Sequence, residues 1–306
     1  MIDIQRLDGI KRVFHDLSVA SQQLRTKKMD EDSADDGQVS FQNSDYSLSE
    51  KVKNELNILI FYFQVQRRAL EETDRQAAIF ALIRSGDSAQ KLADIFCGIE
   101  EAIDKVMYRD PSFSWPSVPK GYQIPHQLLM AGEDALKYMP DLADAANRDV
   151  LMVWENTVGK IEVMEKNSVD IIRQSFIEFA ASIGISKDDM NKGMDENEQF
   201  EWCIDYDHSL GDTLEKYLDK LIFFFEVHRI AIQRNDQLAA YIALMNAGIY
   251  AQLASDFFST IKDEVDNVAV LNNRFSWPSV PDDYKLPEHF GMAPHACIES
   301  EPHRSF

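Results

Sequence analysis

The heptapeptide FSWPSVP occurs twice in this chain, at residues 113–119 and 275–281. The two copies lie 162 positions apart, and at that offset the two halves of the chain align without a gap. About four in ten positions between Leu56 and Pro125 are identical to the residues 162 positions later, which indicates an internal repeat. We call two residues at this offset counterparts. The chain is therefore expected to contain two similar folding units.

The repeat sets the expected domain organisation of the 306 residues. We predict a first helical repeat at 1–127 and a second helical repeat at 165–290. A helical connector at 128–164 would join them, and a C-terminal tail at 291–306 would follow. Two such bundles can pack through a pseudo-twofold relation or stack like solenoid repeats, and the sequence favours neither arrangement.

Apolar periodicity predicts helices throughout the repeat. Residues 4–24 carry apolar side chains at three-to-four spacing, which is typical of an amphipathic helix. Ser47 and Glu50 form the S-x-x-E pattern of a capping box, which predicts the start of a second helix. Strand-like alternation is essentially absent, so the sequence predicts an all-α fold.

Turn residues predict where the later helices begin and end. A break is expected at 73–74 and at the counterpart positions 235–236, because short polar side chains there can cap a third helix. Gly86 and Gly248 are expected to end that third helix in a left-handed conformation. A fourth helix would follow each glycine. The predicted fold is a tandem duplication of a roughly four-helix unit, each followed by an extended proline and tryptophan strap.

The repeated heptapeptide cannot continue the preceding helix, because its prolines lack a backbone N–H and bias their neighbours toward extended geometry. We expect each copy to lie back as a strap over the bundle that precedes it and to close one end of that bundle's core with its aromatic side chains. The alternative is an exposed aromatic and proline surface that docks a partner. The residues given this structural role are Phe113, Trp115, Pro116, Pro119, Phe275, Trp277, Pro278 and Pro281.

Two arginines and two aspartates recur at counterpart positions. Arg67 and Asp94 lie on consecutive predicted helices of the first repeat, and Arg229 and Asp256 occupy the same positions in the second. We predict that each arginine forms a partly buried ion pair with its aspartate and so orients the helices. The alternative is a polar ligand pocket built from the same residues.

The chain is strongly acidic, with 31 basic and 52 acidic residues and a formal net charge of −21. Such a charge repels phosphate backbones and anionic lipid, which disfavours nucleic-acid and membrane partners. A basic protein partner is the natural complement, and acidity that serves only solubility is the simpler alternative. The residues predicted to face the partner are Asp30, Glu31, Asp32, Asp35, Asp36, Asp195, Glu196, Glu198, Glu201, Asp205 and Asp207.

No motif in the sequence points to catalysis, and we expect neither a metal nor a cofactor. The densest group of potential ligands spans residues 203–208 and is not repeated in the first copy, while the histidines and cysteine of the tail fit no common zinc spacing. The three cysteines are odd in number and widely spaced, so a reducing cytoplasm is the expected location. The N-terminal residues show no signal-peptide pattern.

These features together predict a non-enzymatic, cytoplasmic binding protein. The version we favour is an intracellular inhibitor of the immunity type, which neutralises a basic toxin or effector. An adaptor or a secretion chaperone would show the same features, and a homodimer is compatible with them. Two other classes stay open. One is a metal-dependent enzyme with a site around His208 and His228 in the second repeat only, and the other is a nucleic-acid mimic.

Overall fold

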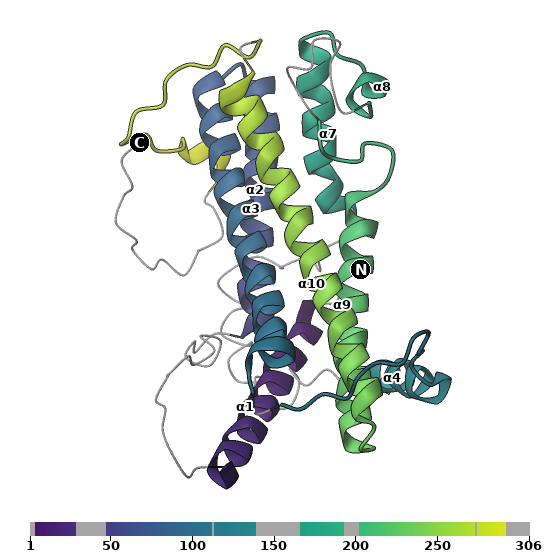
Figure 1. Cartoon of the computed structure of the whole chain (residues 1–306). Helices are drawn as coiled ribbons and strands as arrows, with labels where there is room; N and C mark the ends of the chain where they lie inside the picture. The colour runs from purple at the N-terminus through teal and green to yellow at the C-terminus, as the bar shows by residue number, and fades with distance from the viewer. Residues whose placement is uncertain are drawn as a thin grey trace. The chain divides into compact units, whose positions relative to one another are not determined.

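The fold is known from a computed structural model, which describes residues 4–28, 47–111, 113–138, 166–192, 202–272 and 274–291. Within these ranges the chain is mostly helical and forms no strand, which confirms the predicted all-α class. The elements in chain order (Figure 1) are η1 (Ile4–Leu7), α1 (Asp8–Lys28), α2 (Leu48–Glu71), α3 (Arg75–Asp104), η3 (Lys105–Arg109), α4 (His126–Tyr138), α7 (Lys166–Ser182), α8 (Lys187–Met190), α9 (Leu210–Gln233), α10 (Gln237–Asp266), η4 (Asn267–Leu271) and η5 (Glu288–Phe290).

The long helices recur at the offset of the sequence repeat. Helices α2 and α9 are counterparts over their full length, as are α3 and α10, and the last two each end in a π-helical turn, η3 or η4. Thr73 and Asn235, in the connecting turns, have φ angles of 61° and 57°. Asp74 and Asp236 each accept a 3.0 Å hydrogen bond from the backbone N–H three residues later. The predicted break is therefore confirmed in both copies.

Gly86 and Gly248 do not end a helix, so that prediction is wrong: α3 and α10 continue through them without interruption. Each glycine instead allows the side chain of another helix to come close. A Cβ atom on Gly86 would lie 2.9 Å from Cγ1 of Val265, and one on Gly248 would lie 3.3 Å from Cγ2 of Ile103. The expected third and fourth helices are thus a single long helix in each copy.

Packing divides the chain into two compact units, each of which takes helices from both halves of the sequence. Unit 1 consists of Met1–Glu50, Asp94–Lys166 and Gly211–Asp256, and unit 2 consists of Lys51–Ala93, Asn167–Leu210 and Phe257–Phe306. The sequence instead suggested division at the repeat boundaries, 1–127 and 165–290. The two divisions differ because α3 and α10 each contribute one part to unit 1 and the other part to unit 2, whereas each of these helices lies within a single sequence repeat.

Unit 1 is built around α1, α4, α9 and the first part of α10. The carboxylate of Asp8, at the start of α1, accepts hydrogen bonds of 3.0 Å from the N–H of Ser49 and 2.6 Å from its hydroxyl. Phe14 on α1 meets Phe225 on α9 edge to face, with 5.6 Å between ring centroids. Leu128, at the start of α4, is buried in a cluster with apolar residues of α9 and α10.

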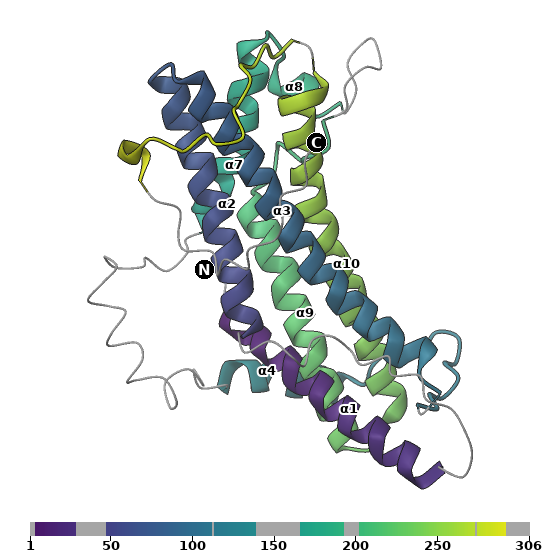
Figure 2. The same ribbon diagram turned by 90° about the vertical axis from the view of Figure 1, so that its left-hand side faces the viewer.

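Unit 2 is built around α2, the first part of α3, α7 and the last part of α10. Small side chains let α2 and α3 pack closely, and four fully buried alanines belong to one apolar cluster: Ala69, Ala77, Ala78 and Ala81. Residues 274–287 run across these two helices, as Figure 2 shows. The turn η5 then places Phe290 in the same buried cluster. The second heptapeptide therefore covers a helical hairpin of the first repeat.

In the described part of the chain, one helix, Gln237–Leu271, is long and apolar enough to cross a membrane by length and composition. The core helix of a soluble protein passes the same test, and 44% of the most apolar window of this helix is buried in the structure. One such helix is weak evidence for a membrane, so the cytoplasmic location stays a prediction.

Candidate binding pocket

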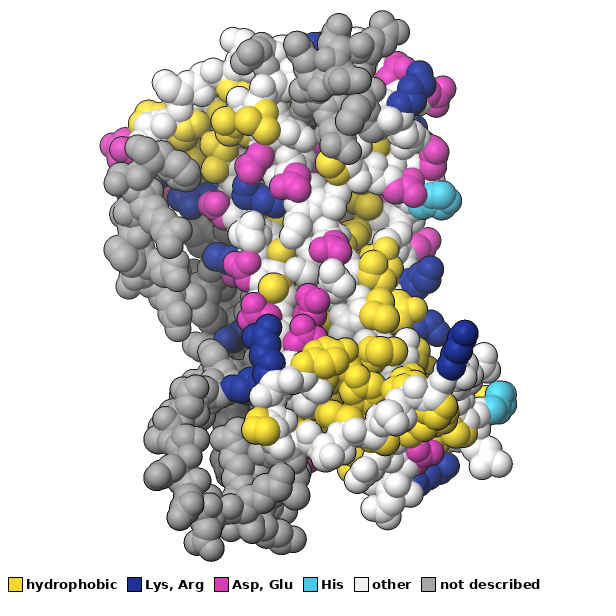
Figure 3. Space-filling view, in the orientation of Figure 1, with side chains coloured by type: hydrophobic (Ala, Val, Ile, Leu, Met, Phe, Trp, Pro, Cys, Tyr) yellow, Lys and Arg dark blue, Asp and Glu magenta, His cyan; other side chains and the backbone are white. Residues whose placement is uncertain are grey.

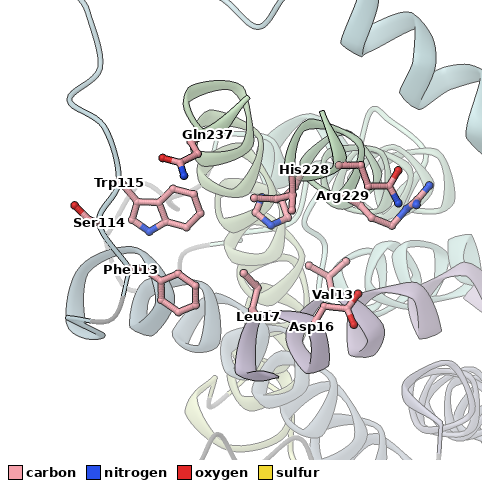
Figure 4. Close-up of a pocket in the computed structure, with 11 residues that line it drawn as sticks. Val13, Asp16, Leu17, Phe113, Ser114, Trp115, His228, Arg229 and Gln237 are labelled. Carbon is pink, nitrogen blue, oxygen red and sulfur yellow. The ribbon is translucent and has the colours of Figure 1, made fainter. Parts of the chain in front are cut away.

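Unit 1 contains a pocket of about 300 Å³ that is open to solvent on one side and is lined by the first heptapeptide, α1, α9 and the start of α10 (Figure 4). This volume is at the lower end of the range for small-molecule sites. Its apolar lining residues are Val13, Leu17, Phe113, Trp115 and Ile232. Its polar lining residues are Asp16, Ser114, His228, Arg229, Gln233 and Gln237.

Two aromatic rings of the first heptapeptide form one wall of the pocket. Phe113 and Trp115 stack with 5.9 Å between centroids and 12° between planes, and Trp115 also packs against Tyr241 at 5.5 Å. The indole N–H of Trp115 donates a 3.1 Å hydrogen bond to the carbonyl of Val106. Because Val106 belongs to η3, the π-helical turn supplies the acceptor that fixes the tryptophan.

His228 contributes a buried polar group to the pocket and is only 2% exposed. Its Nδ1 lies 2.8 Å from the carbonyl oxygen of Ala240, which can only accept, so Nδ1 carries the hydrogen. Burial lowers the pKa of His228, which keeps the ring neutral near neutral pH. Nε2 is then a hydrogen-bond acceptor on a ring that lines the cavity, and the described residues provide no hydrogen-bond partner for it.

Arg229 is bound by a carboxylate other than the one predicted. Its guanidinium donates to both oxygens of Glu226, including a 3.0 Å bond from Nε to Oε2. Hydrogen bonding to Glu226 raises the pKa of Arg229. The predicted pair with Asp256 is wrong as to partner, because a glutamate one turn earlier on the same helix reaches the guanidinium. Asp16, on α1, lines the same pocket and lies across from Arg229 (Figure 4).

In the corresponding region of unit 2, a phenyl ring packs against the aromatic pair. Phe179, the counterpart of Leu17, lies edge-on to Phe275 and Trp277, with centroid distances of 5.8 and 5.7 Å. Phe275 and Trp277 stack at 6.3 Å and 18°, much as their counterparts do in unit 1. The indole N–H of Trp277 donates a 2.8 Å bond to the carbonyl of Val268. The same aromatic pair therefore meets a phenyl ring in one unit and a cavity in the other.

The polar groups beside the two regions differ as well. Arg67 donates hydrogen bonds of 3.1 and 2.7 Å to the two carboxylate oxygens of Glu178. The predicted pair of Arg67 with Asp94 is thus also wrong as to partner. Glu178 is the counterpart of Asp16, whose side chain is one methylene shorter. The longer side chain of Glu178 forms a bidentate ion pair with Arg67. Among the described residues of unit 1, no ion pair joins the counterparts Asp16 and Arg229.

Most of the acids predicted to face a partner lie outside the described residues, and these are Asp30, Glu31, Asp32, Asp35, Asp36, Asp195, Glu196, Glu198 and Glu201. The other two lie on an exposed loop before α9. Asp205 contacts the ring of His208 at 2.7 Å, and Asp207 pairs with Lys187 at 2.9 Å. Both carboxylates are therefore already engaged by cationic or polar neighbours.

A buried carboxylate that was not predicted from the sequence holds this loop. Glu264 on α10 is fully buried, and its Oε1 accepts hydrogen bonds from the N–H groups of Cys203 and Ile204 at 2.7 and 3.2 Å. The hydroxyl of Tyr206 donates a third, at 2.7 Å. Burial nevertheless raises the pKa of Glu264 to about 7. Its counterpart is Ala102, and this difference between copies is the signal that could have revealed it.

The same kind of signal marks the pocket. Leu17 and His228 differ from their counterparts, Phe179 and Gln66, although the neighbouring aromatic pair is unchanged. Positions that differ between the two repeats, next to residues that are identical in both, could therefore have been identified from the sequence. The sequence alone could not show that these positions lie together, because one belongs to the first repeat and the other to the second.

No group of three or more His, Cys, Asp or Glu residues that could hold a metal ion occurs within the described ranges. His208 is exposed beside Asp205, and His228 is buried against Ala240. His289 lies 3.0 Å from Glu72 on the surface of unit 2. The remaining potential ligands of the C-terminal tail lie outside the described residues.

Comparisons of the chain with models of protein families, with curated proteins and with solved structures gave no match.

Proposed function

We propose that the chain is a non-enzymatic binding protein that neutralises a basic protein partner, as an immunity-type inhibitor does. In this proposal the chain arose by tandem duplication of a helical unit followed by a proline and tryptophan strap. The scaffold presents acidic segments, and the partner is a basic toxin or effector whose cationic surface those segments cover. Binding by surface complementarity requires no catalytic group.

The observation that carries the proposal is the uneven distribution of charge along the chain. Residues 29–46 contain six acidic and no basic residues, and residues 193–201 contain four acidic and no basic residues. These segments occupy corresponding positions in the two repeats, shortly before α2 and α9. The described surface is different, since acidic and basic side chains are interspersed on the face shown in Figure 3.

A uniform acidic surface is enough to explain solubility, but two acidic segments at corresponding positions call for a more specific reason. Concentrated carboxylates steer a basic partner over a distance of about 10 Å at an ionic strength near 0.1 M. Such steering acts mainly on the association rate, and it disappears as salt screens the charges. The largest expected effect is therefore on the association rate at low salt.

The experiment begins with affinity capture from the source cell at about 50 mM salt, where the Debye length is long. We expect a basic protein to be retained and to be lost at about 1 M salt. The association rate of that protein is then measured with a variant in which five acids of the first segment, Asp30, Glu31, Asp32, Asp35 and Asp36, are replaced by lysine. We expect the rate to fall by at least about tenfold.

A matched control reverses five exposed acids of the described scaffold, namely Glu71, Glu101, Glu133, Asp282 and Asp283. Both variants change the net charge equally, so a general charge effect would slow them equally. The proposal requires the segment variant to be slower than the scaffold variant. Equal rates, or retention of no basic protein at low salt, would contradict it.

A further inference from the structure

We propose that the pocket of unit 1 binds a neutral, phenyl-sized aromatic ring that carries a hydrogen-bond donor, as a phenol does. The inference rests on the geometry of the pocket and of its counterpart in unit 2. It does not depend on the acidic segments, so it can be tested independently of the proposed inhibitor function.

The shape of the occupant follows from unit 2. There the ring of Phe179 lies edge-on to both members of the stacked aromatic pair. In unit 1 the same pair is present, but Leu17 takes the place of Phe179 and the cavity of about 300 Å³ remains. Apolar cavities of about 150 Å³ are large enough to hold benzene, so the pocket has room for a substituted ring. Edge-to-face contact with Trp115 and Phe113 would favour an aromatic occupant over an aliphatic one.

The donor requirement follows from His228. Its Nδ1–H is used by the carbonyl of Ala240, so the neutral ring offers only the lone pair of Nε2 to the cavity. Burial lowers the pKa of this histidine, which disfavours a protonated ring that could donate instead. A hydroxyl or N–H on the occupant would donate to this nitrogen, whereas a purely apolar ring would cover it and leave it without a partner.

The charge of the occupant follows from the charged groups in and beside the pocket. Arg229 and Asp16 line the pocket, and the charge of Arg229 is neutralised by its ion pair with the buried Glu226. The three groups carry one net negative charge, so an anionic ligand such as a carboxylate is repelled. The phenol class therefore fits the pocket better than aromatic acids of the same size.

The test is a titration of the full chain with p-cresol, followed by NMR of the indole N–H of Trp115. We expect saturable binding with a Kd of about 0.1–1 mM, as is reasonable for a ligand of this size. Toluene lacks the donor and 4-methylbenzoate is anionic, and each should bind at least about fivefold more weakly. No saturation below about 10 mM p-cresol would overturn the site, and equal affinity for toluene would overturn the role of His228.

Two substitutions of corresponding residues make the test specific. Leu17→Phe introduces the side chain that fills unit 2, and we expect p-cresol affinity to fall at least about tenfold. Phe179→Leu makes the opposite change in unit 2, and it should leave p-cresol binding to the pocket of unit 1 unchanged. Ile232→Phe narrows the pocket from a wall that is 44% exposed, so it serves if the first variant fails to fold. Unchanged affinity in a folded Leu17→Phe or Ile232→Phe protein would overturn the proposal.

The ring can come from a free small molecule or from a tyrosine side chain of a polypeptide. N-acetyl-tyrosinamide presents the same phenol on a peptide backbone and separates the two sources. Affinity within about threefold of p-cresol would support a tyrosine of a partner protein as the occupant. Affinity at least about tenfold weaker would support a free phenol, because the pocket would then exclude the backbone.

Discussion

Two corresponding regions of this chain share the same aromatic pair and differ in what lies against it. In unit 2, Phe179 packs against the rings of the second heptapeptide, and the adjacent Glu178 pairs with Arg67. In unit 1, Leu17 and Asp16 occupy the same positions on α1 and leave a cavity. The framework is thus the same in both regions, and the residues facing the space differ. An unfilled cavity lowers the stability of the fold, so its presence in unit 1 is consistent with a site that a ligand fills.

The comparison also shows how the heptapeptide is used. Each copy packs against the helical hairpin of the other repeat, since Trp115 contacts α10 and the second copy covers α2 and α3. This differs from the expectation that a strap closes its own bundle. The sequence could not distinguish the two, because repeats that are alike present similar hairpins to either strap.

The largest difference should appear when the two tryptophans are removed. Trp277→Ala is expected to lower the free energy of unfolding by about 4 kcal/mol, because Trp277 contacts Phe179 and lies under the guanidinium of Arg75. Trp115→Ala should cost about 2 kcal/mol, because one side of that ring already faces a cavity. Urea unfolding measures both. Equal losses would show that the two regions are equally well packed and would contradict the difference described above.

The second effect concerns Glu264, whose counterpart is Ala102. The pKa of Glu264 in the folded protein is about 7, above its ordinary value of 4.5, so the folded protein keeps a proton that the unfolded chain releases. Its contribution to stability is therefore fully present below pH 4.5 and is lost as the pH rises through 7. The loss amounts to about 3 kcal/mol.

Urea unfolding of the wild type and of Glu264→Gln between pH 4.5 and 7.5 isolates this contribution, because other carboxylates affect both proteins alike. The wild type should lose stability relative to the variant as the pH rises. A difference that does not change with pH would mean that Glu264 is ionised throughout, because its hydrogen-bond donors outweigh burial.

A smaller effect is expected at the two turns. Thr73 is β-branched and has a φ angle of 61°, whereas Asn235 tolerates its φ of 57° more easily. Thr73→Gly should raise the free energy of unfolding by about 0.5–1 kcal/mol, and Asn235→Gly by only a few tenths. Thermal unfolding compares the two variants. A larger gain at Asn235 would contradict the assigned backbone strain.

The smallest effect concerns the ion pair of unit 2. Arg67 and Glu178 are 32% and 41% exposed, so solvent screens their interaction. Glu178→Asp should cost about 0.5 kcal/mol, while the reciprocal Asp16→Glu should change stability little because Arg229 is already held by Glu226. A stabilisation of about 1 kcal/mol by Asp16→Glu would show that Arg229 prefers the cross-helix partner. Chemical denaturation measures both variants.

Local features of the fold were predictable because their physics is local. The capping box was predicted, and Ser47 and Glu50 exchange hydrogen bonds of 3.0 and 3.3 Å. The break before Asp74 depends on a cap within four residues and was also predicted. Gly86 was misjudged because a glycine permits both a helix end and a close helix contact, and only the position of Val265 decides between them.

The partners of charged groups were not predictable from the sequence, because several acids lie within one or two helical turns of each arginine. Arg67 binds Glu178, which is 111 residues away in the chain. The pocket was missed for a related reason: its walls come from both repeats, and Leu17 and His228 gave no sign of lying together. Comparing counterparts would have identified the divergent residues, although not their arrangement.

The most direct test of the account concerns its claim that each heptapeptide closes on the other repeat. The chain is divided into two fragments, residues 1–138 and 166–306, which together retain every described contact. The account predicts that neither fragment unfolds cooperatively alone and that an equimolar mixture forms a 1:1 complex with a cooperative urea transition. Two fragments that each unfold cooperatively on their own and do not associate would contradict it.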